Sequence, residues 1–235
     1  MLAVRGLTVD IQASRILRDV TLEVGEREVV ALVGRNGAGK TTTLRTVMGY
    51  LRPAAGDVAF KGRSLVGLPT HAIASLGIGF SPEESEVFGD LTVAENIEIA
   101  TWTRRSARTP AERVERAYAV FPKLRGYAAR GGTQLSGGER KMLSVARALA
   151  LDPDLLLLDE PFEGLSPAIV PLVAESIAEI ARLGVAILVA ESNIHHVPER
   201  TSRLYVLERG EIVFAGKPQD ALRDAAVLRI IGGAP

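Results

Sequence analysis

The sequence predicts an α/β fold built on a mostly parallel central sheet. Apolar runs within Glu28–Val33, Asp154–Leu158 and Val185–Ala190 are typical of strands that are covered on both faces. Each run is joined to a segment with helical periodicity, and an alternation of strand and helix is characteristic of parallel sheets. Two additions complete the predicted fold: an antiparallel β subdomain at the N-terminus and an inserted helical subdomain.

The first strands are predicted to be antiparallel and half-buried, because apolar and polar residues alternate along them. The apolar members of this pattern are Leu2, Val4, Val20, Leu22 and Val24. After the strand within Glu28–Val33, apolar spacing predicts a helix that ends at Gly49. These segments place the N-terminal part of the chain in the core that contains the sheet.

Strand signals are absent between Thr92 and Ala150, where the apolar spacing is helical. The predicted helices are Val93–Ala100, Pro110–Val120 and Gly137–Ala150. Within the second helix, Glu112–Arg116 is predicted to form a mixed-charge face exposed to solvent. The chain is therefore expected to be one domain, with a core of residues 1–90 and 151–235 and a helical subdomain of residues 91–150.

Strand patterning returns after Arg203. The apolar segments Leu204–Leu207 and Ile212–Phe214 flank Glu208–Glu211, which is typical of a hairpin turn. A last helix is expected near Pro218–Arg223, and the small residues 232–235 end the sequence.

The composition excludes several classes of protein. The 28 Lys and Arg residues balance 28 Asp and Glu residues, so the chain lacks a basic footprint and no nucleic-acid partner is expected. Cysteine is absent, which excludes disulfides, thiolate catalysis and cysteine-ligated metal sites. The N-terminus shows no signal-peptide pattern, and the longest apolar runs are shorter than the roughly 20 residues that span a bilayer. A cytoplasmic protein without a membrane span of its own is expected.

A phosphate-binding loop is predicted where the strand Val29–Val33 runs into the pattern G-x-x-x-x-G-K-[ST] and then into a helix. Glycines let backbone N–H groups close on phosphate oxygens, and a helix N-terminus adds about half a positive charge. Lys40 is expected to reach the β- and γ-phosphates of a nucleotide, and the Thr41 hydroxyl to ligate Mg²⁺. The residues predicted to bind the nucleotide here are Gly34, Arg35, Asn36, Gly37, Ala38, Gly39, Lys40, Thr41 and Thr42.

A pair of carboxylates follows the strand of leucines at Leu155–Leu158. Side chains at the carboxyl ends of strands lie where open α/β sheets bind their ligands, so Asp159 is expected to face the Mg²⁺ held by Thr41. Glu160 is then placed to take a proton from an attacking water. Two acids that merely end a strand would be the commoner case, but the upstream phosphate-binding loop favours the catalytic interpretation.

A serine flanked by glycines opens the predicted helix Gly137–Ala150. By itself the pattern of Ser136 and Glu139 is a capping box, which stabilises a helix N-terminus. Exposed N–H groups and a hydroxyl at such a terminus also form a second phosphate site. The residues of this segment are Leu135, Ser136, Gly137, Gly138 and Glu139.

Taken in order along nearly the whole chain, these motifs resemble those of ATP-binding cassette (ABC) transporter ATPases. Gly34–Thr41 matches the Walker A loop, Leu135–Glu139 the LSGGE signature, and Leu155–Glu160 the Walker B strand with its catalytic glutamate. The resemblance implies a P-loop NTPase fold of the ABC ATPase type, with ATP and Mg²⁺ as cofactors. It also implies a head-to-tail dimer with a second ABC ATPase subunit, in which Ser136 and Gly138 act in trans on the γ-phosphate.

Further stretches resemble the second ATPase subunit of branched-chain amino acid importers. These stretches are Ser81–Glu83, Leu91–Asn96, Phe121–Leu124, Gly164–Pro167 and Glu191–Asn193. The resemblance implies two transmembrane permease subunits as partners and, indirectly, an extracytoplasmic solute-binding protein. It places the chain at the cytoplasmic face of the cell membrane as a peripheral protein. The expected activity is ATP hydrolysis that drives uptake of branched-chain or related amino acids; another solute, such as urea or amides, is an alternative.

Four positions differ from the pattern of most ABC ATPases. The usual glutamine, switch histidine, post-Walker B aspartate and adenine-stacking aromatic are replaced by Glu83, Ser192, Ser166 and Ile11. Glu83 can still bind Mg²⁺ and accept from water, and Ser192 can donate one hydrogen bond. Ile11 would give adenine apolar contact without stacking. Hydrolysis is expected to survive because Glu160 and the signature are intact.

Two other functions are compatible with the motifs. The missing switch histidine permits a regulatory subunit of a heterodimeric transporter that binds ATP and hydrolyses it weakly. A soluble ABC ATPase of DNA repair or translation is disfavoured by the zero net charge and by the absence of a long coiled-coil insertion or a second cassette.

Overall fold

The computed structural model describes residues 1–231 and divides them into two compact units. Of the described residues, the first unit combines 1–73 with 186–231, and the second comprises 74–185. These bounds differ from the predicted 1–90, 91–150 and 151–235. The reason is that the strands Ile78–Ser81 and Leu155–Asp159 and the helix Val170–Arg182 belong to the same unit as the inserted helices. The predicted subdomain division itself stays a prediction, and the expected end segment 232–235 lies outside the described residues.

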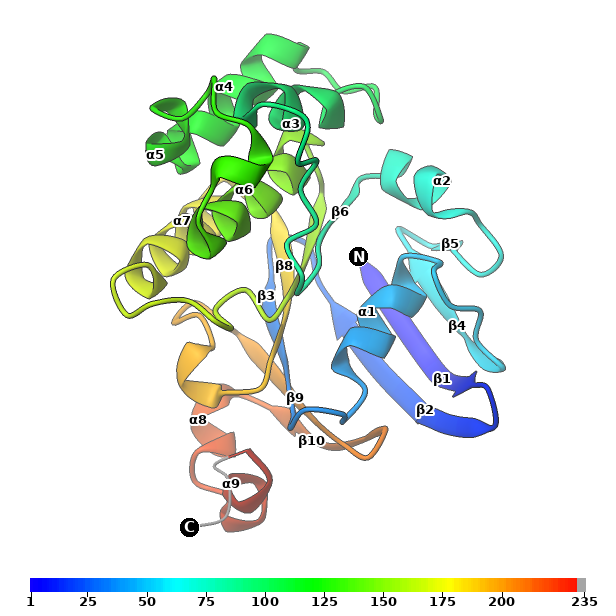
Figure 1. Ribbon diagram of the computed structural model, residues 1–235. Helices are drawn as coiled ribbons and strands as arrows, with labels where there is room; N and C mark the ends of the chain where they lie inside the picture. Colours follow the sequence, from blue (N-terminus) through cyan, green and yellow to red (C-terminus); the bar gives the residue numbers. More distant parts are fainter. Residues whose placement is uncertain (232–235) are drawn as a thin grey trace. The chain divides into compact units, whose positions relative to one another are not determined.

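An antiparallel sheet with strand order β2-β1-β4-β5 forms part of the first unit (Figure 1). Its strands are β1 (Leu2–Ile11), β2 (Ser14–Val24), β4 (Ala55–Phe60) and β5 (Arg63–Ser64). In the register, Leu2 lies opposite Val24 and Val4 opposite Leu22. The alternating apolar side chains are buried, as the period-two pattern predicts. The N-terminal β subdomain is therefore confirmed.

The first unit also contains the strands that support the phosphate-binding loop. They are β3 (Val29–Val33), β8 (Ala186–Glu191), β9 (Arg203–Glu208) and β10 (Glu211–Gly216). β3 pairs in parallel with both β8 and β9, and every residue of β3 and β8 is buried, as expected for strands covered on both faces. The β9–β10 hairpin turns through Arg209 and Gly210, which have φ values of 49° and 84°, the pattern of a type I′ turn.

The helical elements of this part of the chain are short. They are α1 (Lys40–Val47), the 3₁₀ turn η2 (Ile194–His196), α8 (Pro218–Ala221) and α9 (Ala225–Ile231), while α2 (Thr70–Ser75) crosses the boundary between the units. α1 ends at the C-cap Met48 before Gly49, as predicted. α9 was not predicted.

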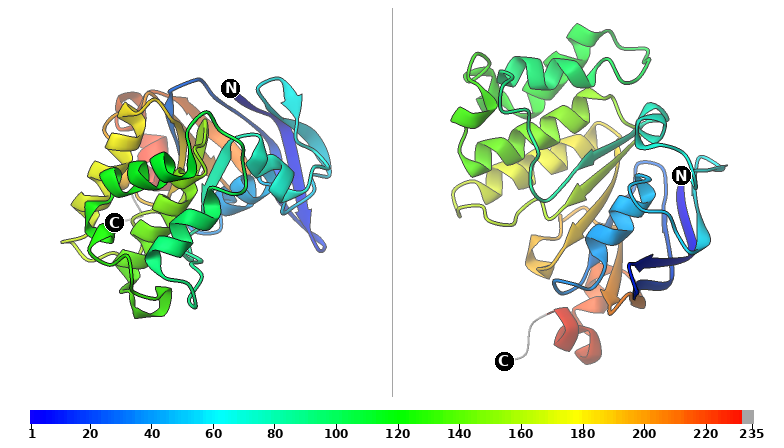
Figure 2. Two further views of the ribbon diagram at one scale, coloured as in Figure 1. Left: turned by 90° about the horizontal axis from the view of Figure 1, so that it is seen from above. Right: turned by 45° about the vertical axis from the view of Figure 1, so that its right-hand side comes forward.

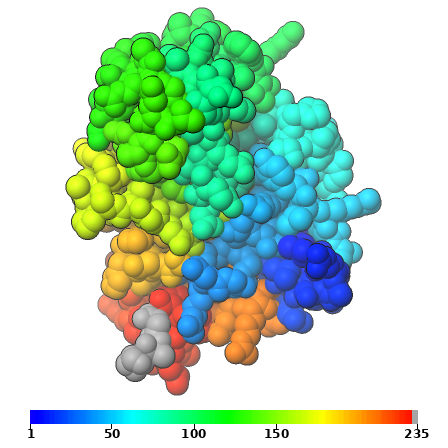
Figure 3. Space-filling view, in the orientation of Figure 1, coloured from blue at the N-terminus to red at the C-terminus, as the bar shows by residue number. Residues whose placement is uncertain are grey.

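The second unit pairs β6 (Ile78–Ser81) in parallel with β7 (Leu155–Asp159) and adds most of the helices. These are α3 (Val93–Ala100), α4 (Pro110–Val120), α5 (Pro122–Arg125), the 3₁₀ turn η1 (Gly132–Gln134), α6 (Gly137–Ala150) and α7 (Val170–Arg182). α3, α4, α5 and α6 gather in one cluster (Figure 2), and their residues form a continuous green surface in Figure 3. The inserted helical region is confirmed.

Capping boxes explain why the three predicted helices begin where they do. Thr92, Thr109 and Ser136 each accept a hydrogen bond from the backbone of the glutamate three residues later, and that glutamate accepts one in return. Pro110 also occupies the first turn of α4, where its missing N–H costs nothing.

The predicted solvent face at Glu112–Arg116 is confirmed for Glu112 and Glu115, which are exposed, but is wrong for the two arginines. Arg113 is only 2% exposed and donates to the carbonyl oxygens of Ala150 at 2.8 Å and Thr101 at 2.9 Å. The next arginine on the same face of the helix, Arg116, bonds to Asp152 at 2.6 Å. Charge patterning did not reveal this, because an arginine can bury its stem and guanidinium when carbonyl oxygens accept its hydrogen bonds.

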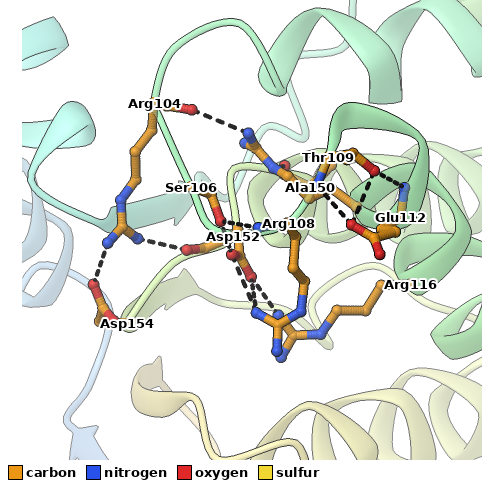
Figure 4. Close-up of polar contacts among 10 residues, drawn as sticks. Arg104, Ser106, Arg108, Thr109, Glu112, Arg116, Ala150, Asp152 and Asp154 are labelled. Carbon is orange, nitrogen blue, oxygen red and sulfur yellow. Dashed lines mark hydrogen bonds and ion pairs between the residues drawn. The ribbon is translucent and has the colours of Figure 1, made fainter.

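Asp152 is the centre of this cluster (Figure 4). The Ser106 hydroxyl and the guanidinium groups of Arg108 and Arg116 all donate to its carboxylate. Burial alone would raise the pKa of Asp152, but these hydrogen bonds and positive charges hold it below its ordinary value. The cluster thus ties the loop before α4 to the turn after α6.

No helix within residues 1–231 is both long enough and apolar enough to cross a membrane.

Candidate nucleotide-binding site

The phosphate-binding loop begins where β3 ends. Gly34 donates its N–H to the carbonyl of Glu191 at 3.1 Å, which anchors the loop to the end of β8. A Cβ at position 34 would lie 2.3 Å from the carbonyl oxygen of Leu207. No side chain fits there, so only glycine lets the start of the loop pack this closely against Leu207.

Lys40 lies at the first position of α1 and is 5% exposed. Its Nζ donates to the carbonyl oxygens of Gly34 at 2.7 Å and Arg35 at 3.2 Å, so the ammonium lies across the loop. The N-cap residue Gly39 supplies no side-chain cap, and α1 therefore presents its N-terminal amides to a ligand. This arrangement of an ammonium and helix amides fits a polyphosphate.

Two other predicted residues lie in the same unit. Ile11 ends β1 and is 39% exposed, so its apolar side chain is available for contact with a ligand. Ser192 directly follows β8 and is partly buried. The preceding residue, Glu191, is 1% exposed, and its Oε2 lies 3.6 Å from Nδ1 of His196.

The predicted acidic residues belong to the second unit. Asp159 is the last residue of β7, and Glu160 follows it; they are 1% and 3% exposed. Glu83 lies two residues beyond β6. Burial raises the pKa of Glu83 above its ordinary value, and the charges of Glu163, Glu84 and Glu160 raise it further.

Lys141 of α6 joins these two acidic segments. Its Nζ donates to the carbonyl oxygens of Glu83 at 2.7 Å and Glu160 at 3.2 Å. Its positive charge also lowers the pKa of Glu83, against the effect of the neighbouring carboxylates. The structure therefore brings Glu83 and Glu160 together through a residue that the motifs did not identify.

The signature segment forms the N-terminus of α6 in the same unit. Ser136 is the N-cap: its Oγ accepts from the N–H of Glu139 at 3.3 Å, and its own N–H donates to the Glu139 carboxylate at 2.9 Å. Leu135 is buried, and its carbonyl accepts from Arg140 at 2.7 Å. The predicted capping box is present, and the helix is 14 residues long, so its N-terminus is suited to binding an anion.

The donors present fit Mg²⁺ bound together with a nucleotide. Among residues 1–231, no three histidine or acidic side chains are grouped closely enough to hold a metal by themselves. Mg²⁺ in nucleotide sites typically takes only one or two protein oxygens and completes its shell with phosphates and water. The first unit offers one oxygen donor of this kind, the Thr41 hydroxyl, and the second unit offers the carboxylates of Asp159 and Glu83.

The sequence motifs predicted neither the bonds of Lys141 to the two backbone carbonyls nor the burial of Glu191. A weak signal existed for Lys141, because it lies four residues before Val145 on the apolar side of the predicted helix. A charged residue in such a stripe needs a buried partner. Glu191 ends an apolar strand run, where an acid by itself is a common terminator.

The chain is similar to proteins of one known family. A family model described as ABC transporter matches residues 17–163. The chain is 35% identical over 235 residues to the lipopolysaccharide export system ATP-binding protein LptB of Haemophilus influenzae, covering 99% of this chain and 97% of that protein. It is 40% identical over 198 residues to the high-affinity branched-chain amino acid transport ATP-binding protein BraG of Pseudomonas aeruginosa, covering 84% of each. A dimeric bacterial ABC transporter cassette has the same fold, with a TM-score of 0.82 over 93% of this chain and 99% of that chain at 23% identity.

Proposed function

Because this chain belongs to the ABC transporter family and is an ATP-hydrolysing subunit of that family, we propose that it powers the uptake of branched-chain or related amino acids through separate permeases. The observation that carries the proposal is the set of motifs in its structural setting. The phosphate-binding loop joins β3 to α1, the serine-capped signature begins α6, and the carboxylate pair ends β7. The identity to BraG supports the choice of solute.

ATP is proposed to bind with its phosphates on the Gly34–Thr42 loop. The Lys40 ammonium would neutralise the β- and γ-phosphates, and Ile11 would contact the adenine. The Thr41 hydroxyl, Asp159 and Glu83 would hold Mg²⁺, which when bound supplies positive charge to the phosphate oxygens.

Glu160 is proposed to be the general base. Its carboxylate would accept a proton from the attacking water, while Lys40 stabilises negative charge on the phosphate. Ser192 would donate one hydrogen bond where most of the family has a histidine. It cannot supply the positive charge of a protonated histidine. Lys40 and the signature would therefore have to stabilise the negative charge on the phosphate.

The signature is proposed to act on ATP bound to a second cassette. The Ser136 hydroxyl and the N–H groups of Gly137 and Gly138 at the start of α6 would meet the γ-phosphate across the dimer, with Leu135 and Glu139 holding the segment in shape. ABC cassettes dimerise and work with membrane components, and a cassette of the same fold is known as a dimer. The proposed partners are a second cassette, two permeases at the cytoplasmic face of the cell membrane and, indirectly, an extracytoplasmic solute-binding protein.

Lipopolysaccharide export is the second candidate function. The match to LptB covers 99% of this chain, more than the 84% covered by the match to BraG, although at lower identity. An ATPase can serve either process, because the permeases rather than the cassette contact the transported molecule. The two candidates therefore differ in the partners that the chain recruits.

The test is purification of the tagged chain with its membrane partners, followed by reconstitution in proteoliposomes. Amino acid import predicts that a solute-loaded binding protein stimulates ATP hydrolysis and that labelled leucine accumulates. Stimulation by lipopolysaccharide without an effect of the binding protein would contradict import and support export. If the chain purifies without any permease, and neither the binding protein nor lipopolysaccharide changes its rate of ATP hydrolysis, both import and export would be contradicted.

A further inference from the structure

Lys141 is a buried cation that the family motifs do not account for. It lies five residues after Ser136 on the signature helix and is only 3% exposed. Its two carbonyl partners, on Glu83 and Glu160, belong to the two segments that bear the proposed metal ligand and the proposed general base. Burying an ammonium costs free energy unless hydrogen-bond acceptors compensate the charge. The two carbonyl oxygens provide this compensation, so the burial of Lys141 depends on them.

The register of the two strands explains why both carbonyls lie within reach. β6 and β7 run in parallel, with Ser81 opposite Leu158. Two residues beyond these positions, Glu83 and Glu160 leave the sheet at the same edge. A single side chain placed over that edge can therefore bond to both.

The rest of α6 fixes Lys141 in this position. Its Ser144, one helical turn after Lys141, has Oγ 2.8 Å from Oγ of Ser81 in β6. One turn further on, the helix lies so close to β6 that a Cβ on Gly79 would be 2.8 Å from the carbonyl oxygen of Ala148. Residues spaced by three and four lie on one face of a helix, so Lys141 shares the face of α6 that packs against β6. The Lys141 side chain therefore lies beyond the C-terminal end of β6, where Glu83 follows.

The backbone of Glu160 is held in an uncommon conformation. Its φ of 44° lies in the left-handed region, which is unfavourable for a residue with a side chain and persists only when neighbours hold it. The hydrogen bond from Lys141 to the Glu160 carbonyl is one contact that holds it. Loss of this bond would let the peptide, and with it the carboxylate, move.

We propose that Lys141 is a positioning residue for ATP hydrolysis, which fixes the spacing of Glu83 and Glu160 by bonding to both backbone carbonyls from the signature helix. The inference rests on the proposed role of Glu160 as the general base. It also links the two acidic segments mechanically to α6, so that a displacement of the signature helix displaces them as well. Arginine can replace both hydrogen bonds, whereas methionine fills the same volume without a donor.

The experiment compares the wild type with Lys141→Met, Lys141→Arg and Glu160→Gln, with Arg113→Met as the matched control. Arg113 is also a buried cation that donates to backbone carbonyls in the same unit, but its partners are Ala150, Thr101 and Arg104. Two quantities are measured for each: kcat and KM for ATP, and amide hydrogen exchange across residues 83–86 and 160–163.

Lys141→Met is expected to lower kcat at least about 10-fold with KM for ATP changed less than about 3-fold, because the general base is displaced while the phosphate-binding loop is intact. Lys141→Arg should restore most of kcat. Exchange at both segments should accelerate in Lys141→Met and not in Arg113→Met. Glu160→Gln should be nearly inactive.

Wild-type kcat in Lys141→Met beside an inactive Glu160→Gln would overturn the inference alone. An equal loss of kcat in Lys141→Met, Lys141→Arg and Arg113→Met would also overturn it, since that pattern reports general destabilisation. Wild-type kcat in Glu160→Gln would instead contradict the proposed role of Glu160 as the general base. Lys141 would then have no general base to position.

Discussion

At the scale of single residues, the proposed general base Glu160 is the position on which hydrolysis is expected to depend most. Replacing its carboxylate by the amide of Glu160→Gln keeps the size of the side chain and removes the group proposed to accept a proton. Turnover should fall on the order of 10²–10⁴-fold while nucleotide still binds. Phosphate release and the affinity for a fluorescent ATP analogue measure the two effects, and an unchanged rate of phosphate release would contradict the assignment.

Gly34 tests the geometry of the phosphate-binding loop. In Gly34→Ala the new Cβ would collide with the carbonyl oxygen of Leu207, so the loop must shift. We expect a loss of ATP affinity and a decrease of about 1–3 kcal/mol in the free energy of unfolding. The control is Gly62→Ala, whose Cβ meets no atom within 4 Å; its φ of 79° strains the backbone, so this variant should also lose stability but should keep its ATP affinity. Equal ATP affinity in wild type and Gly34→Ala would show that the loop tolerates a side chain.

At the scale of elements, much of the helical region could be predicted from the sequence because each helix carries its own start signal. Thr92, Thr109 and Ser136 precede a glutamate by three residues, and the structure uses all three as capping boxes. The bounds of α7 were not predicted. It begins among residues that resemble a loop, since Pro171 lies near its start, yet a proline is tolerated in the first turn of a helix.

In the candidate site, as in the helices, features encoded by neighbouring residues could be predicted, and features that depend on distant residues could not. The phosphate-binding loop and the carboxylates are recognised from residues that are adjacent in the sequence. The proposed role of Lys141 depends on carbonyl oxygens 58 and 19 residues away. A side chain that bonds to backbone groups requires no particular residue type in its partner, so the sequence carries no matching signal. The burial of Arg113 was missed for the same reason.

The Asp152 cluster predicts a pH-dependent contribution to stability. A carboxylate whose pKa is lower in the folded chain stabilises it above the unfolded pKa, and this stabilisation is lost as pH falls through the folded value. Asp152→Asn should therefore lower the free energy of unfolding by about 3 kcal/mol at pH 7. The difference from wild type should shrink below about pH 4.

Asp10→Asn is the control for this series, because Asp10 pairs with Arg15 at the surface. Solvent screens such a pair, so little change is expected at any pH. Chemical denaturation of the three proteins across pH checks the prediction. A constant difference between wild type and Asp152→Asn from pH 7 to pH 3 would contradict the charged role of Asp152.

At the scale of the whole molecule, the signature and the phosphate-binding loop are proposed to work in different copies of the cassette. Each copy contributes one of each, so an ATP site is complete only when the phosphate-binding loop of one meets the signature of the other. The proposed head-to-tail dimer accordingly makes hydrolysis a property of two chains.

Mixing two inactive variants tests this arrangement most directly. Lys40→Met removes the cation proposed to bind the phosphates, and Ser136→Arg blocks the signature, so each variant alone should hydrolyse almost no ATP. In an equal mixture, half of the dimers contain one of each chain and hold one intact site, which predicts recovery of about a quarter of the wild-type rate of phosphate release. No recovery on mixing, or full activity of Ser136→Arg by itself, would contradict the claim that two cassettes share each ATP site.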